Sequence, residues 1–162
     1  MTKEEIKELF MQGIDCSQVV AGRFADELEM EESLLRKMSA CFGGGMQCGE
    51  TCGAVTGALM VIGLKYGHSM NNDLKQKEIM REKTSEFKRL FAEKYESCMC
   101  RELLGHDISK EDEMEQVLEQ GRIQLFSYVF PTCRRFPARS SAVTLTKDLE
   151  SRLSILALSL VP

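Results

Sequence analysis

Apolar residues recur at helical intervals along most of the chain, and polar capping residues stand where the apolar stripes begin. Thr2 starts a first segment with a capping-box pattern, and Gly13 ends it. Asp15 starts a second segment with Gln18 at the capping-box position, which puts Cys16 at the first helical position. We therefore predict two short helices at the start of the chain.

The stretches 31–42 and 73–96 predict two further helices, of which the second is long and strongly amphipathic. The expected inner face of the first is formed by Leu34, Leu35 and Met38. The expected inner face of the second includes Leu74, Phe87, Leu90 and Phe91. The many lysine and glutamate residues on its other side are expected to face solvent.

The most distinctive stretch, residues 42–67, combines a glycine run, two cysteines and an apolar segment. The run consists of Gly43, Gly44 and Gly45. Because glycine lets the backbone turn sharply and approach a ligand closely, we expect these residues and Gly53 to bind a cofactor. Thr51 is the expected N-cap of a helix that ends near Tyr66, which would put Cys52 at the first helical position.

Gly53 and Gly57 lie on one face of this helix, a spacing that suggests close approach of another backbone segment. Free N–H groups and the helix dipole at a helix N-terminus lower the pKa of a thiol. Cys16 and Cys52 are therefore expected to form thiolates readily, as metal binding or redox chemistry requires.

Two more cysteine-bearing segments follow the long helix. Residues 97–105 predict a short helical turn that carries Cys98 and Cys100 and ends at glycine. A further helix is expected to begin at Ser109 and to end at Pro131, so that Cys133 follows the helix end.

The predicted fold class is all-α, because no alternating strand pattern precedes residue 140. We expect a single-domain helical bundle of about five to seven helices over residues 1–136, with the glycine-rich loop between two of them. Residues 137–162 are expected to form a divergent tail that could contain a short helix.

Composition narrows the function classes. The 162 residues are 43% hydrophobic and 28% charged, with a formal net charge of −4, which argues against nucleic-acid binding. The longest apolar stretch, Ala58–Leu64, is too short to insert into a membrane. The charged, amphipathic start lacks the apolar core of a signal peptide, so we expect a cytoplasmic location.

Seven cysteines in a reducing compartment favour metal binding or redox chemistry over structural disulfides. Their spacing matches neither a zinc finger nor a Cys-x-x-Cys redox motif, so any site must combine distant segments. The candidate metal ligands are Cys16, Cys52, Cys100 and Cys133. Cys41 is expected to be a small buried hydrophobic residue.

The hexapeptide Cys52-Gly53-Ala54-Val55-Thr56-Gly57 resembles the central motif of the redox-active proteins named for a C…GCAxxG…C…C pattern. In that resemblance Cys16, Cys100 and Cys133 match the other three cysteines. It implies a redox role and makes an iron–sulfur cluster or another metal centre plausible. The chain lacks a haem c attachment motif and a nucleotide-binding fingerprint, so neither covalent haem nor a nucleotide is expected.

Three functions are compatible with the sequence. In the leading one, the four family cysteines converge on an iron–sulfur cluster or another thiophilic metal and transfer electrons to an unknown redox partner. In the second, Cys52 is the reactive thiol of a thiol–disulfide protein, with Cys16, Cys48 or Cys100 as resolving partner. In the third, the chain is a non-catalytic helical module whose cysteines pack or hold a structural zinc.

Overall fold

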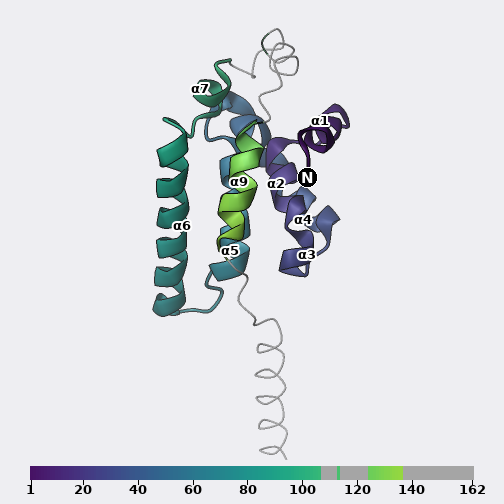
Figure 1. Ribbon diagram of the computed structural model, residues 1–162. Helices are drawn as coiled ribbons and strands as arrows, with labels where there is room; N and C mark the ends of the chain where they lie inside the picture. Colours follow the sequence, from purple (N-terminus) through teal and green to yellow (C-terminus); the bar gives the residue numbers. More distant parts are fainter. Residues whose placement is uncertain (107–112, 114–123, 137–162) are drawn as a thin grey trace, which may run out of the picture.

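The computed structural model describes residues 1–106, 113 and 124–136, which are arranged as an all-α bundle, as predicted (Figure 1). Residues 1–49 contain α1 (Lys3–Met11), α2 (Cys16–Arg23), α3 (Ala25–Leu28), α4 (Glu32–Ser39), a 3₁₀ turn η1 (Ala40–Phe42) and a wide turn η2 (Gly45–Gly49). They are followed by α5 (Gly53–Tyr66), α6 (Leu74–Lys94), α7 (Cys100–Leu104) and α9 (Gln124–Arg134). The predicted tail 137–162 lies outside the described residues.

Helix α5 is the centre of the bundle, in contact with α2, α6 and α9 (Figure 1). Because neighbours cover most of its surface, its sequence is apolar on nearly every side. Its buried side chains include Val55, Ala58, Val61 and Ile62, and they share one core with Phe24, Phe87, Phe91 and Val129. Burying each large side chain of this kind stabilises the fold by about 1.5–3 kcal/mol.

The expected close approach of a second backbone to α5 is confirmed, and that backbone belongs to α2. A Cβ atom on Gly57 would lie 2.8 Å from the Ser17 carbonyl oxygen and 3.0 Å from Val20 Cβ. A Cβ on Gly53 would lie 3.1 Å from the Ser17 nitrogen. Only glycine allows the two helices to pack at this separation.

The predicted start signals of the first two helices are confirmed. The Thr2 N–H donates to Glu5 Oε2 at 2.7 Å, and the Glu5 N–H donates to Thr2 Oγ1 at 3.2 Å. The Asp15 N–H donates to Gln18 Oε1 at 2.9 Å. These bonds satisfy backbone donors that a helix start leaves free, and they fix Cys16 as the first residue of α2.

The predicted inner face of α4 was partly wrong. Leu35 is buried, but Leu34 and Met38 are 46% and 53% exposed. Helix α4 faces α2 through Leu35 and Ser39, and the Ser17 hydroxyl donates to the Ser39 carbonyl at 2.8 Å. Leu34 and Met38 lie on the part of α4 that faces away from this contact.

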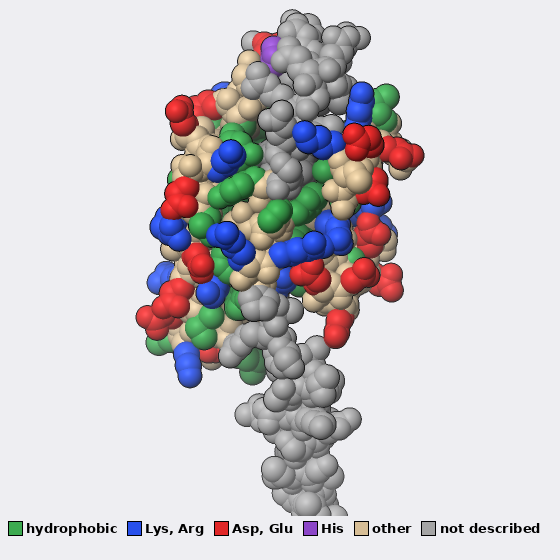
Figure 2. Space-filling model, viewed as in Figure 1, with side chains coloured by type: hydrophobic (Ala, Val, Ile, Leu, Met, Phe, Trp, Pro, Cys, Tyr) green, Lys and Arg blue, Asp and Glu red, His purple; other side chains and the backbone are tan. Residues whose placement is uncertain are grey.

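The prediction for Leu74 was also wrong. As the first residue of α6, Leu74 is 71% exposed, and it precedes the part of the helix that packs on the core. In Figure 2 charged side chains of both signs are scattered along the side of the molecule that carries α6, with hydrophobic side chains between them.

The prediction that Pro131 ends the last helix was wrong. Pro131 lies inside α9, which continues to Arg134, so Cys133 is a helical residue rather than one that follows a helix. Proline removes one intrahelical hydrogen bond. Burial of Val129, Cys133 and Phe136 in the common core offsets this loss.

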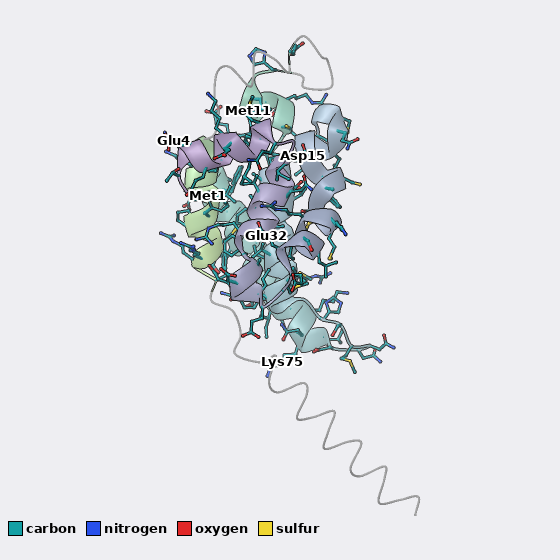
Figure 3. The ribbon with its side chains drawn as sticks, turned by 90° about the vertical axis from the view of Figure 1, so that its right-hand side faces the viewer. Met1, Glu4, Met11, Asp15, Glu32 and Lys75 are labelled. Carbon is teal, nitrogen blue, oxygen red and sulfur yellow. The ribbon has the colours of Figure 1, made fainter. Side chains whose placement is uncertain are left out.

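A buried lysine holds the carboxyl end of α9 against α5. Lys65 Nζ pairs with Glu27 Oε2 at 3.2 Å, donates to the Phe136 carbonyl at 3.1 Å, and lies 5.0 Å from the centroid of the Phe24 ring. Arg134 also pairs with Glu27, at 3.2 Å. Cys133 therefore lies near the end of α5, where α9 also ends (Figure 1). In Figure 3 Asp15, the N-cap of α2, lies in the upper part of the bundle, whereas Lys75, which follows the end of α5, lies at the lower end.

Among the described helices, none has both the length and the apolar character needed to cross a membrane.

Gly57→Ala should lower the free energy of unfolding by roughly 1–3 kcal/mol, because the new Cβ must push α2 away from α5. A Cβ on Gly63, in the same helix, would meet nothing within 4 Å, so Gly63→Ala should raise the free energy of unfolding by about 0.5–1 kcal/mol. Urea titration followed by circular dichroism measures both changes. Equal effects of the two substitutions would show that the α2–α5 contact does not limit stability.

Candidate functional site

Cys52 is the N-cap of α5 rather than its first residue, and Thr51 is not the cap that the sequence predicts. Thr51 instead pairs with Met99 in an isolated antiparallel bridge, which keeps its backbone extended. The Cys52 N–H donates to the Cys98 carbonyl at 2.8 Å, and the Cys100 N–H donates to the Glu50 carbonyl at 2.6 Å. This short ribbon brings Cys100 beside Cys52.

Three of the candidate cysteines meet at Cys52. The Cys52 thiol is hydrogen-bonded to the thiols of both Cys16 and Cys100. Cys52 and Cys100 are buried, whereas Cys16 is partly exposed to solvent. We call Cys16, Cys52 and Cys100 the thiol cluster. It joins the start of α2, the start of α5 and the start of α7.

The glycines of the sequence motif make room for this cluster. A Cβ on Gly53 would overlap Cys16 Sγ, and a Cβ on Gly45 would lie 2.8 Å from Cys100 Cβ. A Cβ on Gly43 would overlap the Asp15 side chain. Close packing within the chain is therefore sufficient to explain why Gly43, Gly45 and Gly53 have no side chain. Cofactor binding by Gly43, Gly44, Gly45 and Gly53 stays a prediction.

The glycine-rich loop makes a left-handed turn beside the cluster. Gly44, Gly45, Met46 and Gln47 have φ angles of 58°, 63°, 58° and 60°. For Met46 and Gln47 this conformation costs about 1–2 kcal/mol each. The turn is held by the Glu50 N–H, which donates to the Gly45 carbonyl at 3.0 Å. Two of the four non-glycine residues with positive φ in the described chain therefore lie in the loop that precedes Cys52.

The expected lowering of the cysteine pKa values was wrong. The hydrogen bond to Cys100 and burial raise the pKa of Cys52 to about 12. The hydrogen bond to Cys52 and burial raise the pKa of Cys16 well above its usual value. Backbone N–H groups do act in the expected direction, from Ala54 on Cys52 and from Gly44 on Cys16, but burial and the neighbouring thiols outweigh them. Both groups are neutral thiols at pH 7.

Cys133 lies apart from the thiol cluster. Burial raises its pKa to about 12, while nearby Lys65 acts in the opposite direction. Lys65 is close to the last residue of α5, whereas Cys52 precedes the first, so the two positions are roughly 20 Å apart along the helix axis at 1.5 Å per residue. The structure thus brings together three of the four family cysteines and leaves the fourth at the other end of α5.

The other three cysteines, Cys41, Cys48 and Cys98, are exposed. For Cys41 this corrects the expectation of a buried residue, because η1 turns it outward after α4. The Cys48 thiol donates to the Gly45 carbonyl at 3.4 Å within its own loop. All seven cysteines are described, and all seven are free thiols.

The four-thiolate metal site expected from the sequence does not fit this arrangement. Within the described ranges, no three His, Cys, Asp or Glu side chains are placed to hold a metal ion. The fourth family cysteine, Cys133, lies near the other end of α5, so the four thiols do not surround the common point that a tetrahedral centre needs.

The pairing of Thr51 with Met99, which joins the segment of Cys52 to that of Cys100, was not predicted. A bridge of one residue pair leaves no periodic pattern in a sequence. The ion pair between Arg101 and Glu50, which ties α7 to the end of the glycine-rich loop, was not predicted either.

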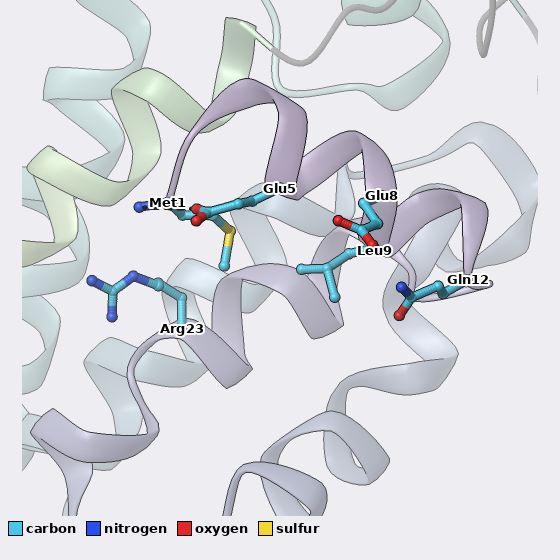
Figure 4. A pocket seen from close by; sticks show the side chains of 6 residues that line it. All are labelled: Met1, Glu5, Glu8, Leu9, Gln12 and Arg23. Carbon is cyan, nitrogen blue, oxygen red and sulfur yellow. Dashed lines mark ion pairs between the residues drawn. The ribbon is translucent and has the colours of Figure 1, made fainter.

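An open pocket of about 530 Å³ lies between α1 and α2 (Figure 4). It is lined by Met1, Glu5, Glu8, Leu9, Gln12 and Arg23. None of these residues is a cysteine, so the pocket is not part of the thiol cluster.

The chain matches the family described as "Putative redox-active protein (C_GCAxxG_C_C)" over residues 14–144. No curated protein and no solved structure shows a match to it. Because the family match covers most of the chain, the protein belongs to this family, and the resemblance seen in the sequence is confirmed.

The raised pKa values predict a loss of stability in alkali. Below pH 9 the Cys52 thiol keeps its proton in both states, whereas between pH 9 and about 12 only the folded state keeps it. The free energy of unfolding should therefore fall as pH rises through this interval. Urea titrations at several pH values should show a shallower fall in Cys52→Ala. An identical slope in both proteins would contradict a buried, neutral Cys52.

Proposed function

We propose that this member of the C_GCAxxG_C_C family is a thiol–disulfide redox protein and that its reversible step takes place in the thiol cluster. The observation that carries the proposal is the position of Cys52, whose thiol is hydrogen-bonded to two other cysteine thiols. Packed apolar side chains would have filled this site equally well, so three adjacent sulfurs favour chemistry between them.

In the proposed step, Cys52 and Cys100 form a disulfide. Each thiol loses one proton and one electron, and the two electrons reduce a disulfide of the redox partner to two thiols. The ribbon between residues 50–52 and 98–100 holds the two backbone segments side by side. The two cysteines of the proposed disulfide therefore belong to neighbouring segments.

Cys16 is the proposed positioning residue. Its hydrogen bond lowers the pKa of Cys52, opposite to the effect of burial and of Cys100. A thiol that donates to Cys52 stabilises the Cys52 thiolate when that thiolate attacks or leaves. Cys16 can therefore promote exchange at Cys52 without itself entering the disulfide.

A thiophilic metal or iron–sulfur centre is the second candidate, because three soft thiol ligands are adjacent. Its weakness is that Cys133, the fourth family cysteine, lies near the other end of α5. We derive no step through such a centre. In either case a redox partner and a cytoplasmic location remain part of the proposal.

A redox titration of the purified protein tests the proposal. Dithiothreitol buffers set the potential, and differential alkylation with mass spectrometry identifies the oxidised cysteines. We expect one reversible intramolecular disulfide that contains Cys52. Cys52→Ser should abolish it, whereas Cys133→Ala, the matched control at the other end of α5, should retain it.

The absence of any disulfide in the thiol cluster across the titration would contradict the proposal. Anaerobic purification followed by iron, zinc and acid-labile sulfide analysis separates the remaining functions. Stoichiometric metal that is lost in Cys52→Ser would support the metal centre. If the protein contains no metal and forms no disulfide, the result would support the third function, a non-catalytic helical module with packed cysteines.

A further inference from the structure

We propose that Cys98 is the entry thiol of this protein, the residue that reacts with the partner's disulfide and passes the oxidation to Cys52. The inference rests on the proposed function and adds a residue outside the four-cysteine pattern. Because Cys52 and Cys100 are buried, an external disulfide needs an accessible thiol through which it can oxidise them.

The thiol cluster is poorly placed to meet a partner. Cys52 is 4% exposed and Cys100 is 2% exposed. Attack on a disulfide requires the attacking sulfur to approach in line with the S–S bond, so a buried thiol reacts slowly with a large or charged partner. An exposed cysteine next to the cluster would remove this barrier.

Of the three exposed cysteines, Cys98 is the one whose backbone is hydrogen-bonded to that of Cys52, through the Cys98 carbonyl at 2.8 Å. The bridge between Thr51 and Met99 places Cys98 directly opposite Cys52 in the ribbon. Cα atoms at such a position are about 5.5 Å apart, within the range of about 4.4–6.8 Å that a disulfide spans. Cys98 is also separated from Cys100 by a single residue.

The other two exposed cysteines are placed differently. Cys48 donates its thiol to the Gly45 carbonyl within the glycine-rich loop. Cys41 lies in η1, at the end of α4. Neither belongs to the ribbon that carries Cys52 and Cys100, so they serve as matched controls for exposure alone.

The proposed sequence of exchanges balances. The Cys98 thiolate attacks one sulfur of the partner's disulfide, forms a mixed disulfide and expels the other sulfur as a thiolate, which takes up a proton. Cys52 then attacks Cys98 Sγ, releases its own proton and expels the second partner thiolate. Finally Cys100 attacks Cys52 Sγ and expels the Cys98 thiolate. The net result is one Cys52–Cys100 disulfide, two partner thiols and a regenerated Cys98.

Glutathione disulfide is a suitable probe because it is charged and too large to enter the core. The rate of intramolecular disulfide formation in the reduced full chain is measured by acid quenching, alkylation and mass spectrometry. Cys98→Ser should slow the reaction by roughly tenfold or more, because the first attack then falls to the thiol cluster, in which Cys52 and Cys100 are buried and Cys16 is only partly exposed. Cys41→Ser and Cys48→Ser should react at the wild-type rate.

The intermediate gives a second readout. In Cys52→Ser, position 52 has no thiol that could attack the mixed disulfide between glutathione and Cys98. Glutathione should therefore accumulate on Cys98, as seen by peptide mapping. Circular dichroism of Cys98→Ser and Cys98→Ala checks that the exposed substitution leaves the fold intact.

Diamide, a small oxidant of dithiols, separates the two proposals. If diamide forms the disulfide in the wild type but glutathione disulfide oxidises Cys98→Ser at the wild-type rate, the entry role is overturned and the proposed function stands. If Cys41→Ser or Cys48→Ser is the slow variant, the entry role of Cys98 is likewise overturned. If neither oxidant forms a disulfide in the wild type, both proposals fail.

Discussion

The site depends on the close contact between α2 and α5. Gly53 and Gly57 let the two backbones meet at Ser17, and this contact sets the start of α2 beside the start of α5. A side chain at Gly53 would occupy the position of Cys16 Sγ. The glycines of the motif and its cysteines are therefore parts of one constraint, since the cysteines can approach one another only where the helices lack side chains.

Burial then determines the chemistry of the thiols. In an apolar core a thiolate is costly, and each neighbouring thiol stabilises the protonated form of the one that donates to it. Cys16 and Cys52 consequently keep their protons at neutral pH, and burial shields Cys52 and Cys100 from solvent oxidants. Three exposed cysteines lie outside it, and Cys98 shares the backbone ribbon with Cys52 and Cys100. The fold thus separates a protected thiol cluster from an accessible thiol.

Local signals in the sequence were sufficient for much of the fold. Capping patterns gave the start of α2, and the glycine pair indicated the close approach of a second backbone. The site was predictable only in part. The pKa direction depends on tertiary burial, which opposed the local effect of the Ala54 N–H on Cys52. Pro131 lies within a helix because core contacts outweigh one lost hydrogen bond. The position of Cys133 follows from that continuation.

The central claim is that Cys16, Cys52 and Cys100 form one thiol cluster without Cys133. Crystal structures of the reduced and the oxidised protein, both prepared without oxygen, test it most directly through the Sγ–Sγ distances. We predict hydrogen-bonding separations from Cys52 to Cys16 and Cys100 in the reduced form, a disulfide bond at Cys52 in the oxidised form, and a distant Cys133 in both. A metal ion or cluster ligated by all four cysteines, or Cys16 and Cys52 in separate apolar pockets, would contradict the claim.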